Sequence, residues 1–149
     1  MKLALRADQP YGEAGQQVLA ARTRELFERV DNVLDTDDPE RVHKMRVATR
    51  RLRAALEVFG ACFAGKPAHE ALAEVKALAA VLGERRDCDV LIELLDALRR
   101  DARRAERAVI DRVIGELREE QTKANKHLAK ELRHVEAVGL ERRLERLSQ

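Results

Sequence analysis

The stretch VHKMRVATRRLRAALEVF, residues 42–59, decides the fold of this 149-residue chain. It carries six cationic or imidazole side chains, which are His43, Lys44, Arg46, Arg50, Arg51 and Arg53. Apolar residues recur among them at the three- and four-residue spacing of an amphipathic helix. We therefore predict a helix that buries one side and concentrates positive charge beside it.

The charge on this predicted helix is directed to one side. At 100° per residue, four of the cations share an arc of about 80° with Glu57. We name these four residues the basic stripe: His43, Arg46, Arg50 and Arg53. Lys44 and Arg51 point away, and apolar residues flank the arc on both sides. Repulsion within the stripe must be offset either by Glu57 together with acids of neighbouring helices, such as Asp87 or Asp89, or by a bound polyanion. The residues alone leave both interpretations open.

Arginine is suited to a phosphate-rich ligand, because its planar guanidinium is always charged and binds two oxygens at once. The stripe spans about 15 Å at 1.5 Å per residue. That length matches a chain of several phosphates better than one small anion.

The remaining sequence predicts an all-α protein, an antiparallel bundle of about four to five main helices in a single domain over residues 1–149. An extended lead-in covers residues 1–12. Helices are expected over 13–34, 39–63, 68–82, 90–100, 105–135 and 140–147.

Several residues support these helix boundaries. Asp38 and Pro39 form a start signal for the second helix, as N-cap and first helical residue. Gly83 is expected to stop or kink the third helix, and Asp87 or Asp89 to cap the next one. In the long helix 105–135, the expected inward positions are Val109, Val113, Leu117, Leu128 and Leu132.

Composition limits the classes of function. The formal net charge is only +2, so any polyanion site must arise from local clustering. Aromatic residues make up 3% of the chain, which disfavours single-stranded nucleic-acid binding by base stacking. No apolar run approaches the roughly 20 residues of a membrane span, and the N-terminus does not resemble a signal peptide. We expect a cytoplasmic protein without a membrane partner.

A second cationic cluster lies on one arc of the long helix, and we name it the late cluster. Its members are Lys123, Lys126, His127, Lys130, Arg133 and His134. It is either an ordinary solvated face or, if turned toward the basic stripe, the opposite wall of a basic channel. In the second case Arg85 and Arg86 are expected to line one end of that channel.

Catalysis and metal binding have little support in the sequence. The only serine is Ser148, and neither a nucleophile–base pair nor a Gly-rich phosphate loop is present. The four histidines lack the spacing of metal ligands on one helix. We expect no catalytic residue, no metal and no cofactor.

The stretch 42–59, followed by LGERRDCDVLIELL at residues 82–95, resembles the CHAD domain, the conserved histidine α-helical domain. The opening residues 3–19 are also similar to the lead-in of that family. The resemblance implies two similar four-helix bundles around a basic channel that binds inorganic polyphosphate without catalysis. Carried onto this chain, it assigns binding to His43, Arg46, Arg50, Arg51 and Arg53, and to the second motif at Arg86 and Asp87.

A second copy of the His/Arg helix is absent from the sequence, so the chain resembles half of the family's domain. We therefore expect a homodimer in which each copy supplies one basic wall, with Arg85, Lys123, Lys126, Lys130 and Arg133 as further candidate ligands. Inorganic polyphosphate is the expected partner, with association with polyphosphate granules, and free phosphate or sulfate would occupy the same site. Two alternatives stay open: a nucleic-acid-binding helical protein, although the aromatic content disfavours it, and a structural dimerisation module whose basic stripe is paired internally.

Overall fold

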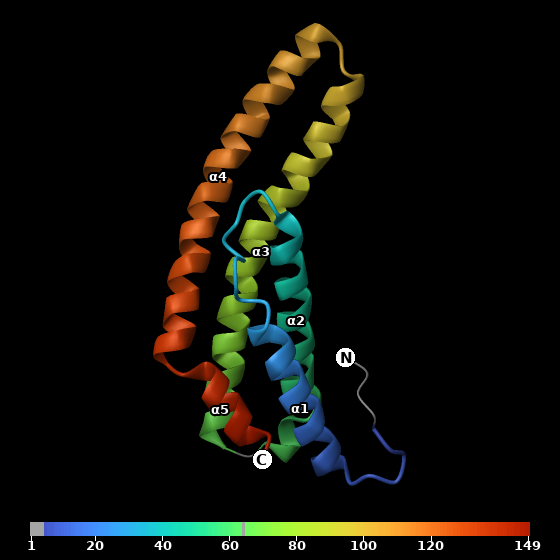
Figure 1. Ribbon diagram of the computed structural model, residues 1–149, viewed down its shortest axis with the longest axis vertical. Helices are drawn as coiled ribbons and strands as arrows, with labels where there is room; N and C mark the ends of the chain where they lie inside the picture. The colour runs from blue at the N-terminus through green and yellow to red at the C-terminus, as the bar shows by residue number, and fades with distance from the viewer. Residues whose placement is uncertain (1–4, 64) are drawn as a thin grey trace.

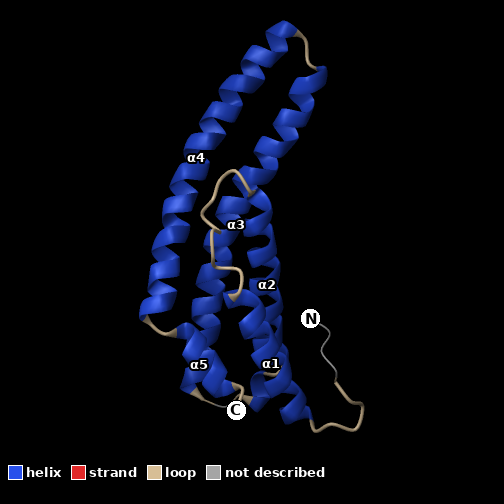
Figure 2. Cartoon of the chain, viewed as in Figure 1, coloured by secondary structure: helices blue, strands red, loops and turns tan. Residues whose placement is uncertain are grey.

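The computed structural model describes residues 5–63 and 65–149, and this part of the chain contains helices and no strand (Figure 1, Figure 2). The helices are α1 (Tyr11–Phe27), α2 (Pro39–Val58), α3 (Lys66–Asp101), α4 (Arg104–Ala137) and α5 (Leu140–Leu147), with a 3-10 turn at Gly60–Cys62. The predicted all-α class is confirmed.

Helix α3 is the centre of the bundle. It packs against α2 on one side and against α4 on the other, while α1 packs on α2 and the short α5 closes the space between α1, α3 and α4 (Figure 1). Its buried residues recur every three or four positions, from Ala68 through Val75 and Leu82 to Ile92. This repeat is why one helix can serve as the shared wall of two helix–helix interfaces.

The start of α2 and the whole of α5 follow the sequence signals. Pro39 is the first helical residue of α2 and Asp38 its N-cap, although the Asp38 carboxylate pairs with Arg41 Nε at 2.9 Å instead of bonding the backbone. Gly139 precedes α5 with a φ of 61°, a left-handed conformation that suits glycine.

Helix α1 ends at Phe27, seven residues before the predicted boundary at Leu34. The following residues form tight turns, with Asn32 at a φ of 58°. They still bury Val33, and Asn125 Nδ2 of α4 donates to the Leu34 carbonyl at 2.9 Å. Contacts with the rest of the bundle therefore stabilise these turns in place of the last two helical turns that we predicted. The sequence has no glycine or proline here that would mark the earlier end of the helix. The predicted lead-in falls partly on residues 1–4, outside the described part, and its last two residues belong to α1.

The predicted break at Gly83 is wrong. Helix α3 continues without interruption for 36 residues, so Asp87 and Asp89 lie inside it and cap nothing. Glycine inside a helix costs only about 1 kcal/mol relative to alanine, and packing along both sides of α3 exceeds that cost. Val109, predicted to face inward, is also an exception: it is 54% exposed near the start of α4.

The beginning of α1 is fixed to the end of α2. The Tyr11 hydroxyl donates to the Val58 carbonyl at 2.7 Å, and the rings of Tyr11 and Phe59 lie 4.9 Å apart. A Cβ placed on Gly15 would come within 2.9 Å of the Phe59 ring and 3.1 Å of its Cβ, whereas one placed on Gly12 would meet nothing within 4 Å. The two helices can approach this closely only because position 15 lacks a side chain.

These two glycines should respond to alanine with opposite signs. We expect Gly15→Ala to lower the free energy of unfolding by about 1–3 kcal/mol, because the added methyl overpacks the contact with Phe59. Gly12→Ala, the matched control in the same helix, should raise it by up to about 1 kcal/mol through helix propensity. Urea unfolding followed by circular dichroism measures both, and equal effects would contradict the close approach at Gly15.

Candidate anion-binding site

The basic stripe lies along the edge of α2 that borders α3. Its core-facing neighbours Val42, Met45 and Leu52 are buried, which fixes the rotation of the helix. His43 and Arg46 are half-buried beside them, while Arg50 and Arg53 are exposed. The predicted direction of the stripe is therefore reproduced, with its side chains at the surface rather than in the core.

One acidic residue links the stripe to α3. Glu57 Oε1 accepts from Arg53 Nε at 3.0 Å and lies 3.4 Å from Lys76 Nζ. The hydrogen bond from Arg53 lowers the pKa of Glu57, so this carboxylate stays charged near neutral pH. Because α2 and α3 run antiparallel, residues that precede Glu57 on α2 lie beside residues that follow Lys76 on α3.

The other three stripe residues have no such neutralisation. Within residues 5–63 and 65–149, no carboxylate lies within 4.0 Å of the side-chain nitrogens of His43, Arg46 or Arg50. Glu57 is already shared between Arg53 and Lys76, and Asp89 is bonded to other residues. Within the described residues, the one acid that pairs with the stripe is therefore Glu57 of α2 itself, at one end, which favours an external anion over an internal ion-pair network.

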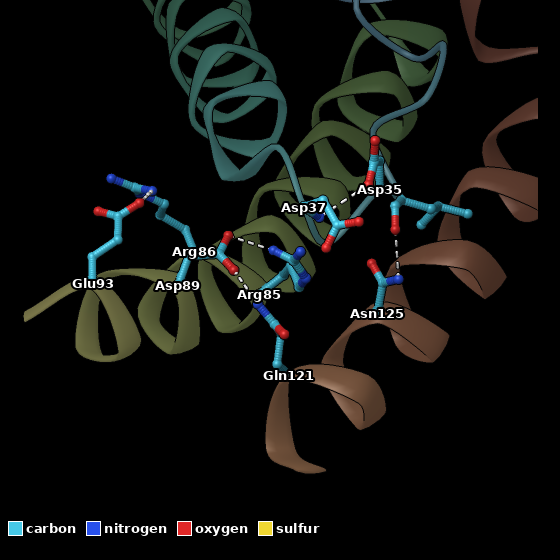
Figure 3. Close-up of polar contacts among 9 residues, drawn as sticks. Asp35, Asp37, Arg85, Arg86, Asp89, Glu93, Gln121 and Asn125 are labelled. Atoms are coloured by element: carbon cyan, nitrogen blue, oxygen red, sulfur yellow. Dashed lines mark hydrogen bonds and ion pairs between the residues drawn. The ribbon is translucent and has the colours of Figure 1, made fainter. Parts of the chain in front are cut away.

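Arg86 of α3 extends the same surface toward the start of α2. Its side chain is only 17% exposed, and its Nη1 lies 3.4 Å from Glu93 Oε1 (Figure 3). A contact of this length to an exposed carboxylate is a weak constraint, so Arg86 can turn toward a stronger anion.

Arg85, predicted at one end of a channel, is buried inside the bundle. Its guanidinium has no exposed area, and its Nη1 pairs with Oδ2 of Asp89 (Figure 3). The other carboxylate oxygen of Asp89, Oδ1, accepts a hydrogen bond from Gln121 Nε2 of α4 at 2.7 Å. The Nε and Nη2 groups of Arg85 have no partner in the described part of the chain. Asp89 therefore joins α3 to α4 through Gln121, and Arg85 supplies the counter-charge of Asp89 inside the bundle, away from solvent.

Arg51 also lies apart from the stripe, as its position on the helical wheel indicates. Its Nη1 donates to Glu25 Oε1 of α1 at 2.6 Å, and Arg22 donates to the other oxygen at 2.6 Å. Although partial burial raises the pKa of Glu25, these arginine contacts lower it by more, so the net direction is down. Arg51 thus fastens α2 to α1.

The late cluster is divided among several neighbours. Lys123 pairs with Glu120 of its own helix at 2.6 Å, and this hydrogen bond raises the pKa of Lys123. His127 and His134 contact Glu84 and Glu74 of α3, at 3.3 Å and 2.9 Å. Two further members, Lys126 and Lys130, are exposed on α4.

Arg133, the remaining member of the late cluster, lines a separate groove of about 690 Å³ between α1, α4 and α5. The apolar residues Phe27 and Leu132 line it too, and the acids Glu28 and Glu136 lie beside Arg133. This mixture of signs is not an anion site.

The basic stripe and the late cluster do not face each other within one chain. Helix α3 packs between α2 and α4, so the stripe borders one of its sides and the late cluster the other (Figure 1). A channel with both walls would therefore require a second molecule.

Sequence reasoning missed Lys76. A lysine on an otherwise ordinary helix gives no signal by itself, but pairing the basic stripe with an antiparallel neighbour would have identified it. The site assembled by the structure consists of His43, Arg46, Arg50, Arg53, Lys76 and Arg86, and we name it the basic face.

Across the described residues, no three side chains of metal-ligating type gather in one place. Likewise, none of the described helices is both long and apolar enough to cross a membrane.

Comparison with protein families finds that the CHAD domain model matches residues 17–149. That match covers most of the chain, including the basic face and all of α2 to α5. Comparison with curated proteins and with solved structures gave no significant match.

The buried network at Arg85 gives a prediction about stability. We expect Asp89→Asn to lower the free energy of unfolding by about 3–5 kcal/mol, because it leaves the guanidinium of Arg85 buried without a counter-charge. The double variant Arg85→Met with Asp89→Leu should recover most of that loss, since it removes both charges. Urea unfolding measures the effect.

The control for this network is Glu93→Gln, which removes the exposed partner of Arg86 and should change stability by less than about 1 kcal/mol. If Asp89→Asn proves no more costly than Glu93→Gln, the buried ion pair does not hold α3 to α4.

Proposed function

Because the chain belongs to the CHAD-domain family, we propose that it binds inorganic polyphosphate on the basic face, without catalysis. The observation that carries this proposal is a set of adjacent cations that have no carboxylate partner among residues 5–63 and 65–149: His43, Arg46 and Arg50. A bound polyanion is the missing counter-charge. Free phosphate or sulfate would act as a weak substitute.

The geometry suits an extended, flexible anion. The stripe runs about 15 Å along α2, and Lys76 and Arg86 of α3 border it. Guanidinium groups bind phosphate oxygens in pairs, and the half-buried setting of Arg46 and His43 strengthens such bonds by excluding part of the water. Successive phosphates can therefore contact successive turns of the helix.

We also propose that the protein acts as a homodimer. The basic face of one chain is a single wall, since α3 separates it from the late cluster. Two copies would present two such faces to one polymer, and the second contact would then form at high effective concentration.

Removing two stripe arginines should separate binding from stability. We expect Arg46→Ala with Arg50→Ala to weaken polyphosphate binding by at least about tenfold, because each charge-assisted hydrogen bond contributes about 1.5–3 kcal/mol. Thermal stability should stay the same or rise, because the change relieves repulsion between like charges. Isothermal titration with polyphosphate of defined length measures the first effect and thermal unfolding the second.

The matched control is Lys130→Ala with Arg133→Ala on α4, which removes the same charge from the late cluster and should change affinity by less than about threefold. Equal losses in both double variants would indicate attraction to net charge alone. A loss of stability without a loss of binding would favour the structural interpretation, in which the stripe is paired internally.

Nucleic acid is the competing ligand, and competition distinguishes it. Both polymers bind with salt-dependent affinity through counterion release, so salt dependence alone does not separate them. We expect polyphosphate to displace a fluorescent DNA or RNA oligonucleotide at far lower phosphate-equivalent concentration, because the basic face lacks aromatic residues for base stacking. Displacement at equal concentration, or preferential retention of the oligonucleotide, would overturn the polyphosphate assignment.

A further inference from the structure

The hairpin of α3 and α4 extends beyond the other helices (Figure 1). We name residues 90–120 the arm, which is the part of this hairpin beyond the hydrogen bond between Asp89 and Gln121. Large apolar side chains are exposed on it to between 43% and 55%. They are Val90, Leu91, Leu94, Leu98 and Val109.

Four of these residues lie on α3 and form a strip along one side of it, while Val109 lies on α4. Leu91, Leu94 and Leu98 follow the three- and four-residue spacing of one helix face. Val90 and Leu94 lie on the same side of α3 as Gly83 and Lys76. Helix α2 packs against that side in the body of the bundle. Helix α2 begins at Pro39 and leaves both side chains about half exposed, Val90 at 43% and Leu94 at 53%. A pair of helices cannot bury its own outer apolar face, and a contiguous face of this kind marks an interface.

The charges of the arm are arranged as a dipole along its length. The tip, residues 98–108, carries five arginines and two acids, a net charge of +3. The rest of the arm carries six acids and two arginines, a net charge of −4. Asp35 and Asp37, in the loop before α2, add negative charge near the base of the arm (Figure 3).

We propose that the arm is a self-association surface: two copies pack their arms side by side in antiparallel orientation and form a four-helix bundle. A two-fold axis through the middle of the arms then places the basic tip of each copy against the acidic base of the other. Parallel packing would instead bring two tips of +3 together. The charge pattern therefore selects both the occupant, a second copy of this chain, and its orientation.

The apolar strip would supply the core of that bundle. The arm contains residues 90–101 of α3 and 104–120 of α4, which are about 18 Å and 26 Å long at 1.5 Å per residue, or about three and five helical turns. Leu and Val side chains that are now half exposed would meet the strip of the second copy in reverse order, so that residues near the tip of one arm lie against residues near the base of the other.

This inference rests on the proposed homodimer but not on the proposed ligand. It also changes the expected geometry, because antiparallel arms place the two bodies at opposite ends of one elongated particle. Each body then offers its basic face separately to a polymer, and the two faces do not close into a single channel.

The first experiment tests the apolar strip by light scattering coupled to gel filtration across a range of protein concentrations. We expect the native chain to be a dimer, and Leu94→Gln with Leu98→Gln to shift its dissociation constant by at least about a hundredfold. The control is Val58→Gln, which changes the 63% exposed Val58 of α2 and should leave the dimer intact. A native chain that stays monomeric, or a dimer that the double leucine variant does not weaken, overturns the proposal.

The second experiment tests the antiparallel orientation with reversed charges. Arg103→Glu with Arg104→Glu makes the tip acidic, and Glu116→Lys with Glu119→Lys and Glu120→Lys makes the base basic. Each of these variants alone should be mainly monomeric, because tip and base then repel. Mixing the two should restore a dimer, since both tip–base contacts again join opposite charges, and failure of the mixture to associate overturns the antiparallel arrangement.

These outcomes are separable from the polyphosphate proposal. Arg46→Ala with Arg50→Ala should lose polyphosphate while remaining dimeric, and the leucine variant should retain binding by each monomer. Loss of dimerisation in the stripe variant, with an unaffected leucine variant, would move the interface from the arm to α2 and overturn this inference.

Discussion

The rest of the structure depends on the continuity of α3. At 36 residues it is nearly twice as long as α2, which has 20. The lower part of α3 is therefore sandwiched between α2 and α4, and its upper part has only α4 beside it. The sandwiched part positions the basic stripe next to Lys76 and Arg86. The upper part leaves leucines without cover. Both surfaces follow from one difference in helix length.

The contact that holds this long helix to α4 lies at the transition between its two parts. Arg85 and Asp89 are one helical turn apart on α3, both buried, and Gln121 completes the network from α4. A buried ion pair contributes little net stability compared with apolar packing, but it tolerates few alternative arrangements. We infer that this network, through the hydrogen bond from Gln121 to Asp89, fixes the register between α3 and α4. The two helices then remain aligned beyond the body of the bundle.

The sequence predicted the fold class and the direction of the basic stripe because both depend on local periodicity. It was misleading at residues 83–89, where a glycine followed by charged residues is typical of a helix end. There Gly83 is tolerated by packing, and Arg85 and Asp89 neutralise each other in the interior. Local pattern cannot distinguish a buried pair from an exposed one, because that depends on which helix lies opposite. The same limit explains why Lys76 was missed and why the late cluster, on the far side of α3, was placed in the same channel.

Cations without acidic partners repel one another, and this repulsion costs free energy unless a ligand offsets it. At the α1–α2 contact, Glu25 pairs with both Arg22 and Arg51, so the fold does place an acid beside arginines where two helices only pack together. Along the stripe, only Arg53 has such a partner within the described residues. Repulsion among the remaining cations destabilises the empty protein slightly, and any anion that bridges them recovers this energy on binding. The stripe is therefore better suited to bind a polyanion than to hold helices together, whereas Arg51 and Arg85, close to it in sequence or space, serve packing.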